Sequence, residues 1–277
     1  LLLAMSLPVT APYWAPILGG LFAIVVVKQF YGGLGRNFLN PALAGRTLLA
    51  TFPGLMTSWV DAFQYPSLLD TADAVSSATP MAYLHTGTLP DLTLGQMLLG
   101  QHGGAMGGTP VFMLLLGGLY LVTRRVITLR IPLAYLGTVA FLTLLFPRGD
   151  GSALDWMIAQ LCCGGVIMGA IFMASDYTTT PVTPLGQTLF GVGSGLLTVL
   201  LRYFGSYPDG VGWAILTMNC GVWLLDRAAI PRRFGQGRFA QVHLWGQQLK
   251  ESAAGIQFIP PKLKLFARAG EGTMPGE

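Results

Sequence analysis

Charged residues are scarce in this chain of 277 residues, where they make up only 10% of the sequence. Soluble domains carry roughly 25% charged residues, whereas apolar residues reach 52% here. The 37 glycines and 18 prolines interrupt long apolar runs, as they do in membrane helices. The composition therefore favours an integral membrane protein over a soluble domain.

Sequence motifs for catalysis, metal binding and nucleotide binding are also missing. The three cysteines and three histidines lack metal-ligand spacing, and the adjacent Cys162 and Cys163 would point about 100° apart on a helix. There is no phosphate loop and no HExxH pattern, and the GGLG of residues 32–35 does not follow a strand. We therefore expect no catalytic side chain, no metal and no NAD bound by this chain.

Strand-like alternation of apolar and polar residues is absent too, so we expect an all-α fold. The predicted architecture is a polytopic membrane helical bundle over residues 1–230, with a basic cytoplasmic tail over 231–277. Some apolar segments are short, as in tilted or interrupted helices. The first begins without a basic flank, so we interpret it as the remainder of a longer segment and not as a signal peptide. The eight predicted segments cover residues 1–11, 14–30, 42–56, 109–123, 131–147, 154–174, 186–204 and 211–226.

Positive charge is distributed unevenly along the chain. Lys and Arg are absent from 57–108, whereas 124–130 holds three arginines and the chain from Arg227 onward holds eight basic residues. By the positive-inside rule, the 124–130 loop and the tail are predicted to be cytoplasmic, and the 57–108 loop extracytoplasmic. The net charge of +4 then reflects orientation and contact with anionic lipid, and no nucleic acid is needed to explain it. If the apolar segments between these regions cross the membrane in turn, the turns 147–152 and 205–210 lie outside, and the breaks 31–40 and 175–184 lie inside.

The two breaks resemble each other in sequence. GGLGRNFLNPALAGRTLL at 32–49 and SDYTTTPVTPLGQTLF at 175–190 align Pro41 with Pro181. The match predicts an internal pseudo-repeat whose interrupted helices expose backbone groups that can bind a ligand or an ion. Ordinary helix ends rich in glycine and proline are the alternative.

The 57–108 loop is too long to be a simple connector, so we expect it to be functional, and its aromatic residues favour order. Within it, residues 73–80 read DAVSSATP, a small and hydroxyl-rich stretch. An exposed hydroxyl among small neighbours suits covalent modification, although a plain Ser/Thr turn has the same composition.

At GGLGRNFLNPALAGR and DAVSSATP the chain resembles the RnfD/NqrB family. These are the flavin-carrying membrane subunits of the Rnf complex and of the sodium-pumping NADH:quinone oxidoreductase. The stretches FMASDYTTTPVTPLGQTLFG, RRVITLRIPLAYLGT and YPDGVGWAILTMN are more similar to RnfD. The resemblance implies an electron-transfer subunit of an ion-translocating ferredoxin:NAD oxidoreductase in the bacterial cytoplasmic membrane, with Na⁺ or H⁺ as the coupling ion.

The resemblance also implies covalent FMN, attached through its phosphate to a threonine in a motif close to D-x-x-[ST]-x-A-T. Asp73, Ser76, Ala78 and Thr79 match this motif, and Ser77 stands where glycine is commoner. By this comparison Thr79 carries the phosphoester, which a flavin transferase of the ApbE type would make.

A second, non-covalent flavin is implied near the cytoplasmic side, namely riboflavin. Asn40 matches the Asn of the family's NPA stretch, and an amide can offer a donor and an acceptor to a flavin ring. Asn37, Asp176 and Thr180 are further candidate contacts. The other expected partners are the remaining subunits of the Rnf complex and membrane lipid.

Two other functions stay open from the sequence. One is an NqrB-like subunit of the quinone-reducing enzyme, because the GGLGRNFLNPALAGR stretch is common to both. The other is a channel or transporter without redox function, for which duplicated interrupted helices would suffice.

Overall fold

The computed structural model describes residues 1–33, 35–55, 59, 79–149 and 151–229, which belong to one compact unit, Leu1–Ala229. All regular structure within these ranges is helical, as the sequence predicts. The predicted tail 231–277 lies outside the described residues, as does most of the 57–78 stretch. The boundary at residue 230 therefore stays a prediction.

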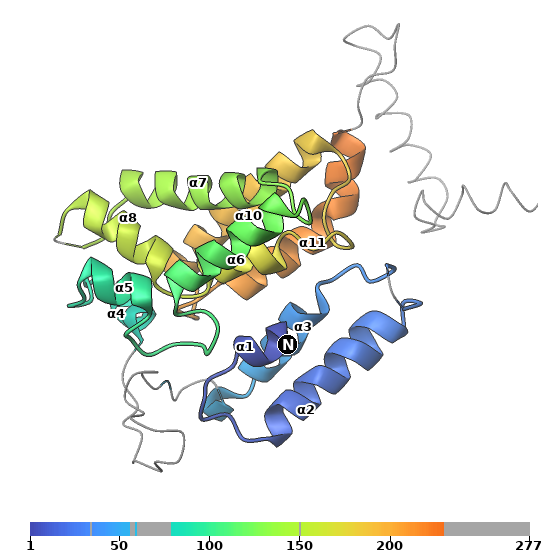
Figure 1. Ribbon diagram of the computed structural model, residues 1–277, viewed down its shortest axis with the longest axis horizontal. Helices are drawn as coiled ribbons and strands as arrows, with labels where there is room; N and C mark the ends of the chain where they lie inside the picture. The colour runs from blue at the N-terminus through green and yellow to red at the C-terminus, as the bar shows by residue number, and fades with distance from the viewer. Residues whose placement is uncertain (34, 56–58, 60–78, 150, 230–277) are drawn as a thin grey trace, which may run out of the picture. The chain divides into compact units, whose positions relative to one another are not determined.

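The helices follow most of the predicted apolar segments (Figure 1). Three differ: the 1–11 run is helical only at its start, because Pro8 and Pro12 interrupt it, the 42–56 run ends its α-helix at Ala50, and the 154–174 run is broken near Gly164. In chain order the elements are α1 (Leu2–Met5), α2 (Trp14–Leu21), η1 (Phe22–Gln29), α3 (Pro41–Ala50), η2 (Pro53–Leu55), α4 (Pro80–Thr86), α5 (Leu94–Leu99), α6 (Val111–Thr123), α7 (Arg130–Leu145), α8 (Ala153–Cys162), α9 (Val166–Met168), η4 (Gly169–Met173), α10 (Pro184–Phe204) and α11 (Val211–Ala228).

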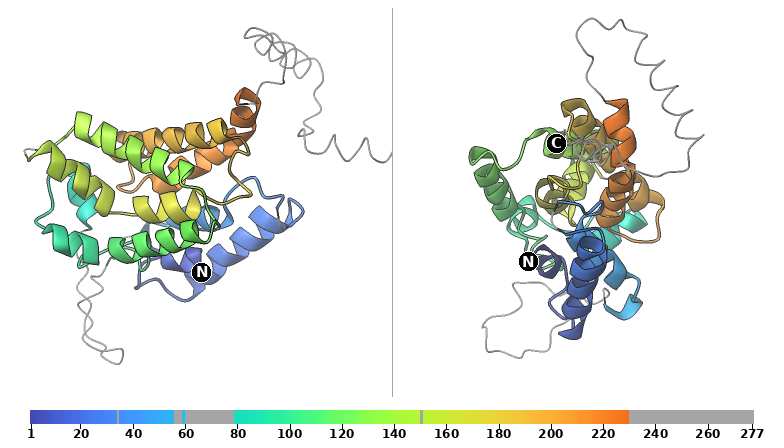
Figure 2. Two further views of the ribbon diagram at one scale, coloured as in Figure 1. Left: turned by 45° about the horizontal axis from the view of Figure 1, so that its top comes forward. Right: turned by 90° about the vertical axis from the view of Figure 1, so that its right-hand side faces the viewer.

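Helix α10 packs along α7 and α11, and both views in Figure 2 keep the three helices together. Two glycines one turn apart, Gly191 and Gly195, let α7 and α10 approach closely. A Cβ at Gly195 would lie 2.9 Å from the Tyr135 carbonyl oxygen. Small residues at this spacing are typical of helix contacts in membranes. The Tyr135 hydroxyl lies 2.6 Å from the Thr198 hydroxyl and fixes the register of the pair.

The predicted 154–174 segment is broken in the middle. Gly164 has a φ of +79°, which favours glycine, and the helices on its two sides are bent by 61°. This bent pair, Ala153–Cys162 with Val166–Met173, is long and apolar enough to cross a membrane only when its parts are taken together. In the part of the chain that the structure describes, α10 alone meets that criterion by itself, and the shorter apolar helices are Trp14–Gln29, α6 and α7.

The segments predicted to lie outside the membrane gather at one end of the described unit. The Nδ1–H of His85, on α4, donates to the Arg202 carbonyl at 2.8 Å. Arg148, in the turn between α7 and α8, donates to the Tyr203 carbonyl and lies over the Tyr203 ring, 4.8 Å from its centroid. Figure 1 shows α4, α5 and the α7–α8 turn together at this end. Which side of a membrane it faces stays a prediction.

The segments predicted to be cytoplasmic meet in the same way at the start of α10 and the end of α11. The Val182 N–H donates to the Asp226 carboxylate at 2.9 Å, and Arg130 donates to the Gln187 side chain at 3.5 Å. These contacts bring the predicted cytoplasmic segments together, and the topology itself stays a prediction.

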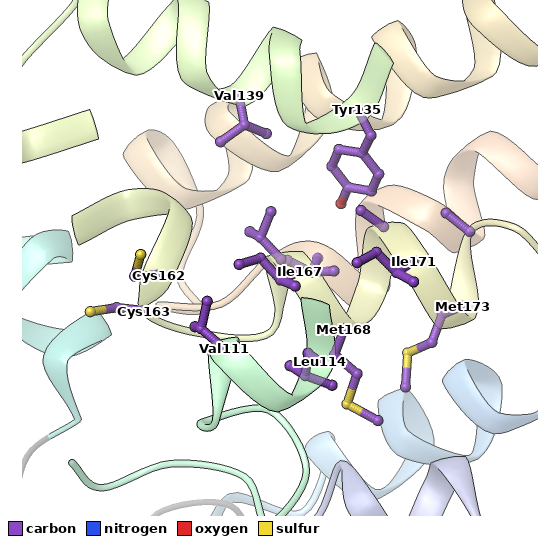
Figure 3. Packing of buried hydrophobic residues seen from close by; sticks show 14 of the residues in the cluster. Val111, Leu114, Tyr135, Val139, Cys162, Cys163, Ile167, Met168, Ile171 and Met173 are labelled. Carbon is purple, nitrogen blue, oxygen red and sulfur yellow. The ribbon is translucent and has the colours of Figure 1, made fainter. Parts of the chain in front are cut away.

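The core fills the space between α7, the bent pair and α6. Figure 3 shows Tyr135 and Val139 of α7 facing Ile167 and Ile171 across this space, all of them buried. In the same view the Met173 side chain points away from Tyr135, toward the N-terminal helices. Met173 and Met168 belong to the core and also line the cavity described in the next section.

Candidate functional site

A cavity of about 180 Å³ lies where α3, the start of α4 and the helix break meet. Its walls come from segments far apart in sequence, and small residues make up much of them. The described residues that line it are Ser6, Arg46, Thr47, Ala50, Trp59, Thr79, Pro80, Met81, His102, Gly103, Gly104, Ala105, Gly108, Thr109, Gly164, Gly165, Met168, Met173, Tyr207, Pro208, Asp209, Gly212 and Trp213.

Thr79 lies at the wall of this cavity, half-buried, at the N-cap position of α4. An N-cap threonine ordinarily accepts a hydrogen bond from the first turn of the helix, but the Thr79 side chain makes no such bond. Pro80 follows at the first helical position, where its fixed φ suits the helix start. The Thr79 hydroxyl is thus not committed to capping. Asp73, Ser76, Ser77 and Ala78 lie outside the described residues.

The charged part of the cavity is Arg46 with Asp209. The Arg46 guanidinium lies 3.4 Å from one Asp209 carboxylate oxygen, and the Arg202 guanidinium lies 3.3 Å from the other. Arg202 is 1% exposed, whereas Arg46 and Asp209 are 17% and 18% exposed. One carboxylate is therefore shared by a buried arginine and an arginine that reaches the cavity.

The pKa of Asp209 is set by opposing effects. Burial raises it, but the charges of Arg202 and Arg46 lower it, and hydrogen bonds from Arg202 and from the Gly165 N–H lower it further. The net result is a pKa below the ordinary value for aspartate, so Asp209 is ionised at neutral pH.

Backbone oxygens hold Arg202 in place. It donates to the Gln160 carbonyl at 2.6 Å and to the Gln160 side-chain oxygen at 2.9 Å. It also donates to the Cys163 carbonyl at 3.4 Å. A Cβ on Gly164 would lie 2.8 Å from the Arg202 guanidinium, so the glycine at the helix break makes room for the arginine.

An aromatic pair, Tyr207 and Trp213, stacks at the cavity with ring centroids 6.3 Å apart and planes 24° from parallel. Both rings are partly exposed. Flat apolar surface beside a cation and a hydroxyl suits a ligand that has a planar ring and an anionic group.

The four candidate riboflavin contacts lie together and do not line this cavity, although Asn40 bonds to Met173, which does. Asn40 caps α3 through its side-chain oxygen and donates to the Met173 carbonyl at 3.0 Å. Asn37 donates to the Thr178 hydroxyl at 3.0 Å. The Asp176 carboxylate accepts from Thr178 at 3.0 Å, and the Thr180 hydroxyl donates to the Asp176 carbonyl at 2.9 Å. These bonds connect the two sequence breaks.

Asn219 of α11 joins the same cluster. In the amide orientation that satisfies both atoms, it donates to the Thr179 carbonyl at 3.3 Å and accepts from the Asn40 N–H at 3.2 Å. Among the described residues, one of the two Asn40 amide N–H groups donates to the Met173 carbonyl and the side-chain oxygen caps α3, so a flavin contact at Asn40 would use the second N–H. Riboflavin binding here stays a prediction. Asn40 and Thr183 each cap a helix that begins with proline, but the pseudo-repeat as a whole also stays a prediction.

Sequence reasoning did not single out Arg46, Arg202 and Asp209 as a site. Arg46 stands in the family stretch ending LAGR and Asp209 in the stretch YPDGVGW, so these motifs were the available signal. Within the described ranges, His, Cys, Asp and Glu form no cluster of three or more that could hold a metal ion.

Comparison with known proteins gives the family of the chain. The model of the NQR2, RnfD, RnfE family matches residues 1–235. The chain belongs to this family.

Three curated relatives show how closely the family members agree. The D subunit of the Na⁺-translocating ferredoxin:NAD⁺ oxidoreductase complex of Acetobacterium woodii is 42% identical, over 84% of this chain and 70% of the relative. The D subunit of the proton-translocating ferredoxin:NAD⁺ oxidoreductase complex of Clostridium ljungdahlii is 38% identical, over 86% of this chain and 73% of the relative. The D subunit of the ion-translocating oxidoreductase complex of Stutzerimonas stutzeri is 36% identical, over 90% of this chain and 79% of the relative.

Proposed function

We propose that this chain is the flavin-bearing membrane subunit of an ion-translocating ferredoxin:NAD oxidoreductase of the Rnf type. The identity of 34–42% to several D subunits of such complexes supports the assignment. One relative is named for Na⁺ and another for protons, so family membership alone does not select the coupling ion. The chain acts as part of an oxidoreductase and works with the other subunits of that complex.

Covalent FMN on Thr79 is the central part of the proposal. The observation that carries it is that Thr79 lines the cavity and that its side chain makes no capping bond. Arg46 and the Tyr207–Trp213 pair of the same cavity fit an anionic phosphate and a planar ring. When bound, FMN supplies electron transfer, while the chain's own residues hold it and set its surroundings.

Attachment requires a donor and a separate transferase of the ApbE type. With a flavin adenine dinucleotide as donor, the Thr79 oxygen forms a bond to the phosphorus of the FMN part. The pyrophosphate bond breaks, AMP leaves, and the hydroxyl proton of Thr79 is released. An accessible side chain on a loop before a short helix suits access by a second enzyme.

The proposed topology is a multi-pass membrane protein with the Thr79 loop outside and the C-terminus in the cytoplasm. The absence of Lys and Arg from 57–108 supports this orientation, as do the eight basic residues from Arg227 onward. Exposed apolar side chains on α6 and α7, such as Phe112, Leu119 and Phe141, would face lipid or neighbouring subunits.

Loss of covalent flavin tests the proposal. Wild-type chain produced together with its transferase should give a fluorescent band on a denaturing gel, and Thr79→Ala should give none. Thr88→Ala removes an exposed hydroxyl nearby and serves as the matched control, which should remain fluorescent. A fluorescent Thr79→Ala chain, or a wild-type chain without any band, would refute the assignment.

A further inference from the structure

Arg46, Arg202 and Asp209, the ion-pair cluster beside the Thr79 cavity, have one positive charge in excess. Arg46 and Arg202 carry two cations, and Asp209 is the single anion that they share. Among the described lining residues, Arg46 is the one Lys or Arg side chain and Asp209 the one carboxylate. A monoanion placed beside Arg46 would therefore bring the group to neutrality.

Arg202 is committed to the protein. Its guanidinium is almost fully buried and donates to Gln160, the Cys163 carbonyl and Asp209. The buried Arg202 guanidinium compensates the negative charge of Asp209, and the Gly165 N–H donates a further hydrogen bond to this carboxylate at 3.4 Å. Asp209 thus keeps a cationic partner even when Arg46 turns to another anion.

Arg46 is committed only weakly. A guanidinium offers five N–H donors, and within the described residues Arg46 makes one hydrogen bond, to Asp209 at 3.4 Å. Arg202 lies nearly as far from the same carboxylate, at 3.3 Å, but it makes four hydrogen bonds to the protein, so the number of partners distinguishes the two arginines. The backbone of Arg46 is fixed, because α3 is capped by Asn40 at its start.

From these contacts we infer that Arg46 binds the phosphodiester that joins FMN to Thr79. The inference rests on the proposed function. A phosphodiester carries one negative charge and two free oxygens, and the fork of an arginine matches two such oxygens. Asp209 and Gly165 act as positioning groups: they hold the Arg46 guanidinium at the cavity wall before flavin is attached. A Cβ on Gly165 would lie 3.2 Å from Asp209 and 3.7 Å from the Arg46 guanidinium, so glycine leaves room for both.

The test compares the wild type with Arg46→Gln and Arg46→Lys, each in the full chain with its transferase. The first readout is the rate at which the fluorescent band appears during labelling. We expect about a tenfold slower rate in Arg46→Gln and a smaller loss in Arg46→Lys, which keeps the charge but lacks the fork. Arg130→Gln is the matched control and should label as the wild type does, because this exposed arginine makes one long bond, to Gln187, among the described residues.

A second readout concerns the attached flavin itself. In the detergent-solubilised native chain, the neutral quencher acrylamide should quench flavin fluorescence more steeply in Arg46→Gln than in wild type, because a phosphodiester without its partner leaves the flavin less restrained. Failure of the two proposals is distinguishable. A wild type without a band contradicts the proposed function, whereas a labelled wild type with unchanged rate and quenching in Arg46→Gln overturns the role of Arg46. If Arg46→Gln does not fold, wild-type behaviour of Arg46→Lys in both readouts overturns it equally.

Discussion

Arg202 and Asp209 form an ion pair at 3.3 Å in which the arginine is 1% exposed and the aspartate 18% exposed. The pair ties the last turn of α10 to the turn before α11. Removing one member of such a pair leaves an uncompensated charge inside the protein. The free-energy cost of that charge exceeds the net stability that the intact pair gives relative to apolar residues at the same positions.

Asp209→Asn should therefore destabilise the chain by about 3 kcal/mol. For a chain of this size that corresponds to a fall in Tm of roughly 10 °C. Thermal unfolding in detergent, followed by circular dichroism, measures the change. Asp91→Asn removes an exposed carboxylate and should leave the Tm within about 1 °C of the wild type. Equal melting of the two variants would contradict the role given to the Arg202–Asp209 pair.

The same pair predicts a pH dependence. The pKa of Asp209 is lowered in the folded chain, so folding favours its ionised form. Its contribution to stability is complete above the unfolded pKa of about 3.9 and is lost as the pH falls through the lower, folded value. The Tm difference between wild type and Asp209→Asn should be constant from about pH 5 to pH 8 and narrow below about pH 4. A Tm difference between the two proteins that narrows at neutral pH would be inconsistent with a lowered pKa of Asp209.

Close packing of α7 on α10 makes a separate prediction. A Cβ on Gly195 would lie 2.8 Å from the Thr138 Cβ and 2.9 Å from the Tyr135 carbonyl oxygen. Gly195→Ala should thus lower the free energy of unfolding by about 1–3 kcal/mol. Gly221→Ala, on α11, is the control, because a Cβ there meets nothing within 4 Å. It should be neutral or stabilising, since alanine favours a helix over glycine. Two variants with the same stability would show that the α7–α10 contact tolerates extra volume.

Much of the helical framework could be predicted from local sequence. Apolar runs indicated the approximate limits of α6, α7, α10 and α11, because each run ends at a glycine, proline or charged cluster. The predicted segment 42–56 also began within one residue of the start of α3, although Asn40 was interpreted there as a flavin contact and not as the cap that it forms. The short helices α4 and α5 were not resolved within the 57–108 loop, where apolar periodicity spans too few turns to be recognised.

The site was only half visible. The resemblance singled out Thr79, but not the arginines and aspartate beside it. Arg46 and Asp209 are 163 residues apart in the chain, so neither periodicity nor spacing could pair them. The room for the buried Arg202 guanidinium comes from the break at Gly164, which no helical pattern reveals.

The bonds between the two breaks also constrain the order of assembly during synthesis. The hydrogen-bond acceptor of Asn40, the Met173 carbonyl, is synthesised 133 residues later. The acceptor of Asn37, the Thr178 hydroxyl, is synthesised 141 residues later. At a synthesis rate of roughly 5–20 residues per second, that delay is on the order of 10 s. For this interval the first helices are without the partner that completes them, so chaperones, insertases or other subunits that meet the nascent chain act on an open N-terminal half.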